Sequence, residues 1–374
     1  MSSSSGLRGV VAGESRISTV DGLEGRLIYR GINIHELAER ASFEEVMYLL
    51  WHGKLPNRSE LDNLQAQLRA SAALPEGVLQ LMRCFPPNAR PMDALRTAVS
   101  ALGMWDPDAG DNSTEANFRK SLRLTAQIAT VVTSFHHLRN DRQPVAPNPS
   151  LDFAANFLYM LTGEPPTDVA ARTFDTALIL HADHEFNAST FSGRVTIATL
   201  SDVHSAVTSA IGTLAGPLHG GANEGVYKML QEIGEPENVE SWLREKLSQK
   251  GYRVMGFGHA VYKTTDPRAT HLKRMAKQLL EERGEGKLFV MSERLEELML
   301  KEKGLHANVD FYSASVYHML GIPVDLFTPV FAVSRVTGWT AHVLEQLADN
   351  RIIRPRAEYV GPTDLHYVPV DERE

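Results

Sequence analysis

The spacing of apolar residues predicts helices over most of the chain. In ASFEEVMYLLWHG, apolar side chains recur on one helix face, Ser42 and Glu45 have the spacing of a capping box, and Gly53 suits the helix end. The same period, with a glycine or Gly-Pro pair soon after each run, occurs in residues 201–214, 239–250, 269–283 and 292–303. Alternation typical of short strands is confined to residues 7–30 and 358–368. We therefore expect an all-α fold.

The balance of apolar and charged residues changes along the chain. Residues 172–220 are apolar with small side chains, residues 228–304 are strongly charged, and apolar character returns after Asp310. This pattern predicts two domains: a large helical domain formed by residues 1–220 and 323–374, and a smaller helical domain inserted at residues 221–322. The cleft between two such domains is the expected place for a ligand.

Composition narrows the classes of function. With 38 Lys and Arg against 46 Asp and Glu, the chain of 374 residues has a net charge of −8, so no overall basic field attracts nucleic acid. Cys84 is the only cysteine, which excludes an intrachain disulfide and fits a reducing compartment. The N-terminal MSSSSGLRGVVAGES does not have the form of a signal peptide, and no run of apolar residues is long enough for a membrane span. We expect a cytoplasmic protein.

Histidines concentrate in the segment LILHADHEFNAST. His181 and His184 are three positions apart, which predicts that they share a helix face. A metal pair assisted by Glu185 is one alternative, although the spacing differs from the H-E-x-x-H motif. For His181 a core position and a ligand-binding role stay open, whereas the polar residues after His184 favour a functional role.

A second histidine lies in LAGPLHGGANEG, where one predicted helix has ended and another begins near Ala222. Gly220 and Gly221 allow a ligand to approach the backbone of this loop. The positive end of a helix lowers the pKa of a nearby imidazole, and a neutral His219 can donate a hydrogen bond to a carbonyl oxygen that gains charge. A loop histidine with an ordinary structural role is the alternative.

The segment RVMGFGHAVYKTTDPR combines Gly256 and Gly258 with His259, followed by two cations. The G-x-G pattern alone is weak, because no strand–helix context supports a dinucleotide site. The cations are more informative: Arg268 can bind a carboxylate through two hydrogen bonds, and Lys263 can contact a phosphate.

Three charged residues follow in apolar surroundings: Asp310 in NVDFYS, Arg335 in FAVSRVTGW and Arg354 in IIRPRAEY. A buried arginine requires an anion, and a buried carboxylate requires a partner or a chemical role. One carboxylate, several histidines and several arginines together suit the binding of a small di- or tricarboxylate. They also suit proton abstraction beside a carbonyl, followed by formation of a carbon–carbon bond.

Read in order, the motifs HADHEFNAST, GPLHGGANE, GFGHAVYKTTDPR, NVDFYS, SRVTGW and IIRPRAEYVG resemble citrate synthases. The N-terminal segment VVAGESRISTVDGLEGRLIYRG resembles their short bacterial and archaeal branch, and the likeness spans nearly the whole chain. The resemblance implies an all-α, two-domain homodimer that condenses acetyl-CoA with oxaloacetate to give citrate and CoA. It implies no cofactor, because the CoA thioester is itself a substrate.

The resemblance also implies a role for each site residue. Asp310 matches the base, His219 matches the residue that stabilises the enolate, and His259 matches the residue that polarises the ketone. The residues that match oxaloacetate or citrate ligands are His184, His259, Arg268, Arg335 and Arg354, and Arg354 would reach across the dimer. The residues that match the CoA site are Arg253, Val254, Met255, Gly256, Phe257, Gly258 and Lys263. Lys263 stands where some relatives carry an arginine.

Three alternatives stay open at this point. The nearest is a 2-methylcitrate synthase, which performs the same chemistry on propionyl-CoA. A metal-dependent hydrolase could use His181, His184 and Glu185. A non-catalytic helical scaffold is disfavoured, because a scaffold has no need to bury arginines.

Overall fold

The computed structural model describes residues 10–259 and 261–373 of the chain. These residues form an all-α fold, as the apolar spacing predicts, with one small sheet near the N-terminus. The absence of a signal peptide was inferred in part from residues 1–9, which lie outside the described residues. No helix in the described part of the chain is both long and apolar enough to cross a membrane.

The α-helices follow one another along the chain in this order: α1 (Ile34–Arg40), α2 (Phe43–His52), α3 (Arg58–Ser71), α4 (Glu76–Arg83), α5 (Pro91–Trp105), α6 (Thr114–Leu138), α7 (Phe153–Thr162), α8 (Asp168–His181), α9 (Ala188–Ile197), α10 (Val203–Leu214), α11 (Ala222–Ile233), α12 (Val239–Ser248), α13 (Pro267–Arg283), α14 (Lys287–Lys303), α15 (Val309–Met319) and α16 (Phe327–Ala348). Each segment predicted to be helical coincides with or overlaps one of them, although α13 and α14 begin two and five residues before the predicted starts at 269 and 292. The expected capping box of Ser42 and Glu45 is present at α2, and Gly53 ends that helix with φ 77°.

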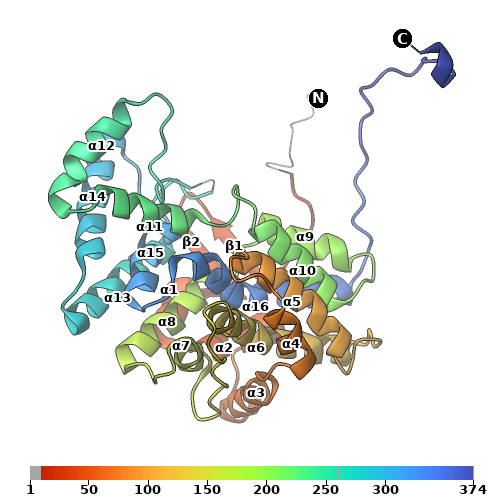
Figure 1. Cartoon of the computed structure of the whole chain (residues 1–374), viewed down its shortest axis with the longest axis horizontal. Helices are drawn as coiled ribbons and strands as arrows, with labels where there is room; N and C mark the ends of the chain where they lie inside the picture. The colour runs from red at the N-terminus through yellow and green to blue at the C-terminus, as the bar shows by residue number, and fades with distance from the viewer. Residues whose placement is uncertain (1–9, 260, 374) are drawn as a thin grey trace.

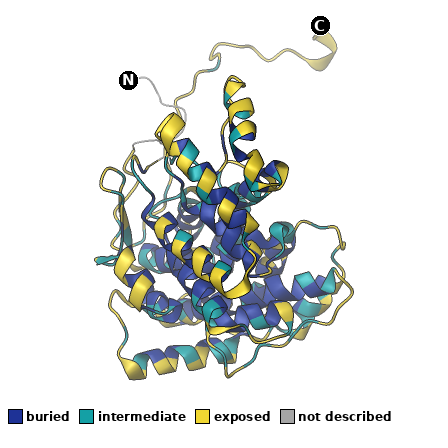
Figure 2. Cartoon of the chain, turned by 90° about the vertical axis from the view of Figure 1, so that its left-hand side faces the viewer, coloured by how far each residue is buried: buried dark blue, intermediate teal, exposed yellow. Residues whose placement is uncertain are grey.

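Two long helices, α6 and α16, pack against each other in the body of the molecule, and other helices surround them (Figure 1). Most residues of α16 are buried, because its sequence is apolar on nearly all sides. Buried residues gather in this body, whereas the chain after Ala348 is exposed along almost its whole length (Figure 2).

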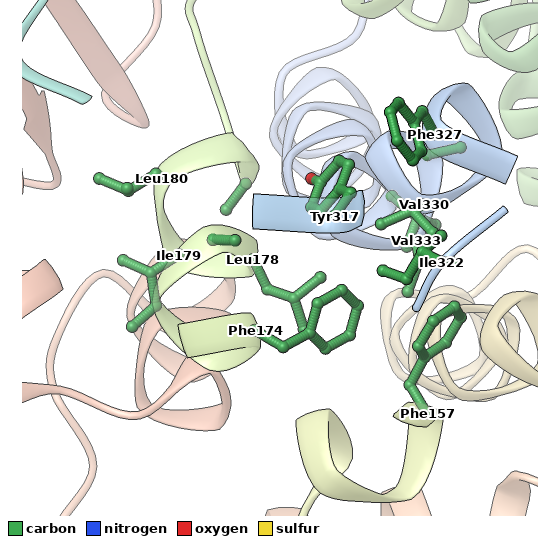
Figure 3. Close-up of a cluster of buried hydrophobic side chains, with 14 of the residues drawn as sticks. Phe157, Phe174, Leu178, Ile179, Leu180, Tyr317, Ile322, Phe327, Val330 and Val333 are labelled. Atoms are coloured by element: carbon green, nitrogen blue, oxygen red, sulfur yellow. The ribbon is translucent and has the colours of Figure 1, made fainter. Parts of the chain in front are cut away.

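One apolar cluster joins four helices that lead toward the candidate site. Phe157 of α7 stacks on Phe174 of α8 with ring centroids 4.9 Å apart, and Tyr317 of α15 packs on Phe327 of α16 at 5.4 Å (Figure 3). All four rings are buried, so the hydrophobic effect stabilises the packing of these helices against one another. Helices from distant parts of the sequence therefore have fixed positions relative to one another.

The sheet has three short antiparallel strands, β1 (Ser18–Asp21), β2 (Arg26–Tyr29) and β3 (Ile32–Asn33), in the order β1-β2-β3. Strands β1 and β2 lie within residues 7–30, where the alternation predicted strands, and β3 lies just after them. The strand expected around Glu358–Val368 does not form: this segment is extended and exposed, and within the described chain no neighbouring strand satisfies its backbone groups.

Helices α11 to α15 form the group predicted to be a separate domain. Among them, α13 and α11 pack on α15, and α12 packs on α14. However, α13 also packs on α8 and α1, which lie in the predicted large domain. A separate domain at residues 221–322 stays a prediction.

Candidate active site

Five segments supply the candidate residues. His184 follows α8, His219 precedes α11, and Arg268 begins α13 just after the loop that carries His259. Asp310 lies in the first turn of α15, and Arg335 lies near the middle of α16. Six charged or imidazole groups are linked by electrostatics. Arg335 lowers the pKa of Asp310, His184 and His219, and Arg268 lowers that of Asp310, His184 and His259.

The prediction that His181 and His184 share a helix face is wrong, because α8 ends at His181. The chain turns there: Glu185 has φ 54°, and its backbone N–H donates to the Ser18 hydroxyl at 3.0 Å. His181 donates from Nδ1 to the Ala177 carbonyl at 2.7 Å and packs edge-on against Phe331. Burial lowers the pKa of His181 to about 3, so it is a neutral core histidine.

His184, in contrast, lies beside the other candidate residues. Its ring centroid is 5.5 Å from that of His259, and burial together with Arg268 and Arg335 lowers its pKa well below the usual value. The imidazole is therefore neutral at physiological pH. No group of three or more His, Cys, Asp or Glu side chains within residues 10–259 and 261–373 is arranged to hold a metal ion.

The surroundings of His219 define which nitrogen carries its proton. The backbone N–H of Ser189 donates to Nε2 at 3.3 Å, and the Ser189 hydroxyl lies 2.8 Å from the same nitrogen. Trp339 Nε1 donates to that hydroxyl at 3.1 Å and holds it in place. A neutral imidazole that accepts at Nε2 carries its hydrogen at Nδ1. Nδ1–H is therefore the group that His219 can offer to a ligand.

The pKa of His219 is lowered to about 4, in the predicted direction but for a different principal reason. Burial is the larger cause and the Arg335 guanidinium is the second, whereas the prediction named the end of a helix. The sequence could not reveal this, because it did not show that α16 passes close to the loop.

His259 is oriented by its own loop. Its Nδ1 accepts hydrogen bonds from the backbone N–H groups of Val261 at 3.0 Å and Tyr262 at 3.1 Å. The proton of the neutral ring therefore lies on Nε2, opposite to the tautomer of His219. Burial and the charge of Arg268 lower the pKa of His259 to about 4, so this N–H donor is uncharged.

Residues 256–258, here called the glycine segment, pair with residues 306–308, just before Asp310. Gly256 and Gly258 have φ 79° and 74°, and Gly258 donates to the His306 carbonyl at 3.1 Å. Asn308 in turn donates from its backbone to Gly256 at 2.9 Å and from its side chain to Gly258 at 2.9 Å. A side chain at position 256 would meet Phe311 at 2.8 Å, so this position requires glycine.

The residues predicted to bind CoA include the glycine segment, the three residues before it, and Lys263. Val254 and Gly256 are buried, Phe257 and Gly258 are partly buried, and the remaining three, Arg253, Met255 and Lys263, are exposed. A pocket of about 190 Å³ lies between the glycine segment and residues 304–308, and Gly258, His259 and Lys263 are part of its wall.

Asp310 has the properties of a base that acts near neutral pH. Burial raises its pKa to about 6, while Arg268 and Arg335 act in the opposite direction. Asn308 caps α15 by accepting from the Asp310 N–H at 3.0 Å, which fixes the first turn. The carboxylate is therefore ionised at pH 7 but binds a proton more readily than an ordinary aspartate.

The two buried arginines differ in their partners. Arg268 forms a bidentate ion pair with Asp266, at 3.0 Å from Nε and 2.8 Å from the terminal nitrogen. Arg335 donates Nε–H to the His181 carbonyl at 2.7 Å, and no ion pair joins it to a carboxylate in the described part of the chain. Arg335 therefore has unused donors for an anionic ligand.

Arg354 is the one candidate that a single chain does not bring to this site. It is exposed in the tail after α16, which extends away from the body (Figure 1).

Sequence reasoning missed three supporting residues: Ser189, Tyr262 and Asp266. Asp266 accepts from the Arg268 and Val309 backbone N–H groups as well as from the Arg268 side chain, and thereby ties α13 to α15. Its position before Pro267 was a readable helix-cap signal. Nothing local to Ser189 indicates His219 and Trp339 as its partners, and nothing local to Tyr262 indicates that its hydroxyl meets His184, because these contacts join residues distant in sequence.

The site combines a carboxyl of raised pKa with neutral imidazoles of fixed tautomer. It also contains a buried arginine, Arg335, that forms no ion pair among the described residues. These groups suit acid–base catalysis on an anionic carbonyl compound. Comparison with known proteins identifies the family. Residues 6–356 match the family model described as "Citrate synthase, C-terminal domain". "Citrate synthase 2" of Bacillus subtilis is 53% identical and is covered completely, as is this chain. The chain therefore belongs to the citrate synthase family.

Other relatives agree over nearly the full length. A "2-methylcitrate synthase" of Shewanella oneidensis is 42% identical over 98% of this chain and 97% of its own. The citrate synthase structure from Pyrobaculum aerophilum has a TM-score of 0.93 at 39% identity, covering 98% of this chain and 94% of its own. A ternary complex of citrate synthase from Thermoplasma acidophilum with carboxymethyl coenzyme A and oxaloacetate has a TM-score of 0.91 at 34% identity, covering 98% of each chain.

Proposed function

We propose that the protein condenses acetyl-CoA with oxaloacetate and water to give citrate and CoA. Family membership supports this activity, and one observation on the site carries it. His219 and His259 are both neutral and carry their protons on opposite nitrogens, and the arginines that lower their pKa values, Arg335 and Arg268, also act on the Asp310 carboxyl, whose pKa burial raises. This set provides a base and two uncharged hydrogen-bond donors, one for each carbonyl that must gain charge.

The first step forms an enolate from the thioester. The Asp310 carboxylate removes a proton from the acetyl methyl group while His219 Nδ1–H donates to the thioester oxygen. A model aspartate has a pKa near 3.9 and a thioester methyl group is a far weaker acid, so the base requires help. A donor already aimed at the developing oxyanion typically contributes about 3–4 kcal/mol to the barrier.

The second step forms the carbon–carbon bond. The enolate carbon attacks the ketone carbon of oxaloacetate, and His259 Nε2–H donates to the ketone oxygen as negative charge moves there. The methyl group has lost one proton and the new hydroxyl gains one, so condensation is balanced without an external acid. Water then adds to the citryl thioester, its acyl–sulfur bond breaks, and citrate and CoA leave.

Substrate binding is assigned to the cations. Arg335, Arg268 and His184 would hold the carboxylates of oxaloacetate. Arg335 would contribute guanidinium N–H groups that form no ion pair within residues 10–259 and 261–373. The glycine segment would lie along CoA, and exposed Lys263 would contact a phosphate as a point charge. No metal and no resident cofactor has a role in this scheme.

We also propose a homodimer in which Arg354 completes the partner's site. The tail that carries it exposes large apolar side chains, including Ile352, Tyr359, Leu365 and Tyr367. A row of this kind on an extended segment suits a surface that another subunit covers. Mixed dimers test the point: when Arg354→Ala subunits are paired with Asp310→Asn subunits, one wild-type site is restored only if the arginine acts in trans.

The experiment for the reaction itself is release of CoA thiol from acetyl-CoA, with and without oxaloacetate, together with detection of citrate. Release that needs no oxaloacetate would contradict the condensation and indicate a simple thioesterase. The Asp62→Asn variant, altered at an exposed residue far from the site in sequence, is the matched control for Asp310→Asn.

A second candidate is 2-methylcitrate synthesis from propionyl-CoA, because a relative of that name is 42% identical over nearly the whole chain. One methylene in an acyl pocket changes selectivity by only about 1–3 kcal/mol. Comparison of kcat/KM for acetyl-CoA and propionyl-CoA decides between the two. A higher value for propionyl-CoA would assign the chain to the second candidate.

A further inference from the structure

Tyr262 lies among the ligands assigned to oxaloacetate but has no role in the scheme above. The residue is 3% exposed, and its hydroxyl is 3.2 Å from His184 Nε2. Its ring centroid is 4.7 Å from that of His259 and 5.6 Å from that of His184, and the Arg268 guanidinium lies 5.8 Å from the ring centre. One aromatic side chain therefore contacts three residues of the candidate site.

The hydroxyl is the informative group. Burial raises the pKa of Tyr262, so the phenol keeps its proton at any physiological pH. Within the described residues, His184 Nε2 is the acceptor that lies within hydrogen-bond distance of this hydroxyl. A buried O–H without an acceptor is costly, so the phenol donates and Nε2 carries the lone pair. His184 then holds its proton on Nδ1.

We propose that Tyr262 is a positioning residue that fixes the tautomer and ring orientation of His184 for oxaloacetate. This inference rests on the proposed function, in which His184 is an oxaloacetate ligand. Tyr262 also donates its backbone N–H to His259 Nδ1. The same residue thus orients one imidazole through its main chain and the other through its side chain.

The test is Tyr262→Phe, which keeps the ring against His184, His259 and Arg268 and removes only the hydroxyl. Loss of one such hydrogen bond corresponds to a change of about 2- to 12-fold. We expect KM for oxaloacetate to rise by this factor while KM for acetyl-CoA stays constant. Tyr312→Phe is the matched control, since it also removes a hydrogen-bonded hydroxyl, to Glu296, from a buried tyrosine.

A double-mutant cycle shows whether the hydroxyl acts through the imidazole. We expect Tyr262→Phe to have no further effect on oxaloacetate binding in a His184→Ala background. An equal loss in both backgrounds, an equal rise in both KM values, or no change at all would overturn the proposal. Thermal unfolding of each variant identifies a general loss of structure, which would also overturn a local role.

A spectroscopic readout separates this inference from the proposed function. With ¹⁵N-labelled histidine, NMR reports which nitrogen of each imidazole carries the proton. We expect His184 to be protonated at Nδ1 in the wild type and to populate both tautomers in Tyr262→Phe. This result would support the positioning role of Tyr262 even if the protein released no CoA. If the Tyr262→Phe enzyme is active and the His184 spectrum is unchanged, the positioning role is overturned while the proposed function stands.

Discussion

Replacement of Asp310 by asparagine should stabilise the fold while it abolishes catalysis. Burial raises the pKa of this carboxyl from 3.8 to about 6, which means that the folded protein disfavours the ionised form. Below pH 3.8 the group is protonated in both states and has no effect. As the pH rises through 3.8 to about 6 the unfolded state ionises first, so the wild type loses stability, and above pH 6 the full cost is present.

The size of the effect follows from the same values. A tenfold change in an equilibrium corresponds to about 1.4 kcal/mol, so a pKa difference from 3.8 to about 6 corresponds to about 3 kcal/mol at pH 8. The Asp310 residue is partly exposed, which reduces the expected gain to about 1–3 kcal/mol. At pH 5 the gain should be about half of its value at pH 8.

Urea unfolding at fixed protein concentration, at pH 5 and pH 8, measures this difference for Asp310→Asn and the wild type. Asp62→Asn is the control, because it replaces an exposed carboxyl whose ion pair with Arg58, at 3.7 Å, contributes little. An asparagine variant that is no more stable than the wild type at pH 8, or that gains equally at both pH values, would refute the reasoning about burial.

Further predictions concern activity. In the wild type, kcat/KM for acetyl-CoA should fall as the pH drops through about 6, because Asp310 must be ionised. If the acidic fall of the pH–rate profile occurs below pH 5, the ionisation belongs to another group. His219→Ala should lower kcat at least 100-fold with the fold intact, as judged by circular dichroism, and near-normal turnover would exclude the role. Arg335→Lys should raise KM for oxaloacetate more than KM for acetyl-CoA, because the planar fork is lost; equal changes would place Arg335 outside the oxaloacetate site.

The sequence indicated the fold class because helices carry local signals. The period of apolar residues and the caps at Ser42 and Gly53 lie within a few positions of the helices they define. The prediction of a strand around Glu358–Val368 was wrong because strand formation depends on contacts that are not local. Its alternation is typical of a strand, but a strand requires a neighbour, and the pattern does not say whether one exists.

The candidate site was predictable in its residue types but not in its connections. Glycines beside His219 and His259, and charges beside apolar residues, were visible in the sequence. Ser189 fixes the tautomer of His219 through a contact between residues 30 positions apart, which no local pattern reveals. The ion pair between Arg268 and Asp266 depends on side-chain geometry, which the sequence does not give. The wrong helix face for His184 came from extending α8 beyond its last residue, His181.

The pairing of the glycine segment with residues 306–308 uses mainly backbone groups, and this has an evolutionary consequence. Peptide N–H and C=O groups are the same in nearly every amino acid, so the exposed side chains of Arg253 and Met255 can diverge without disturbing the register that places Asp310. A single insertion or deletion between Gly256 and Asn308 that shifts this register would displace the carboxylate. We expect homologous enzymes to vary at the exposed positions 253 and 255 and to conserve the register of these two segments.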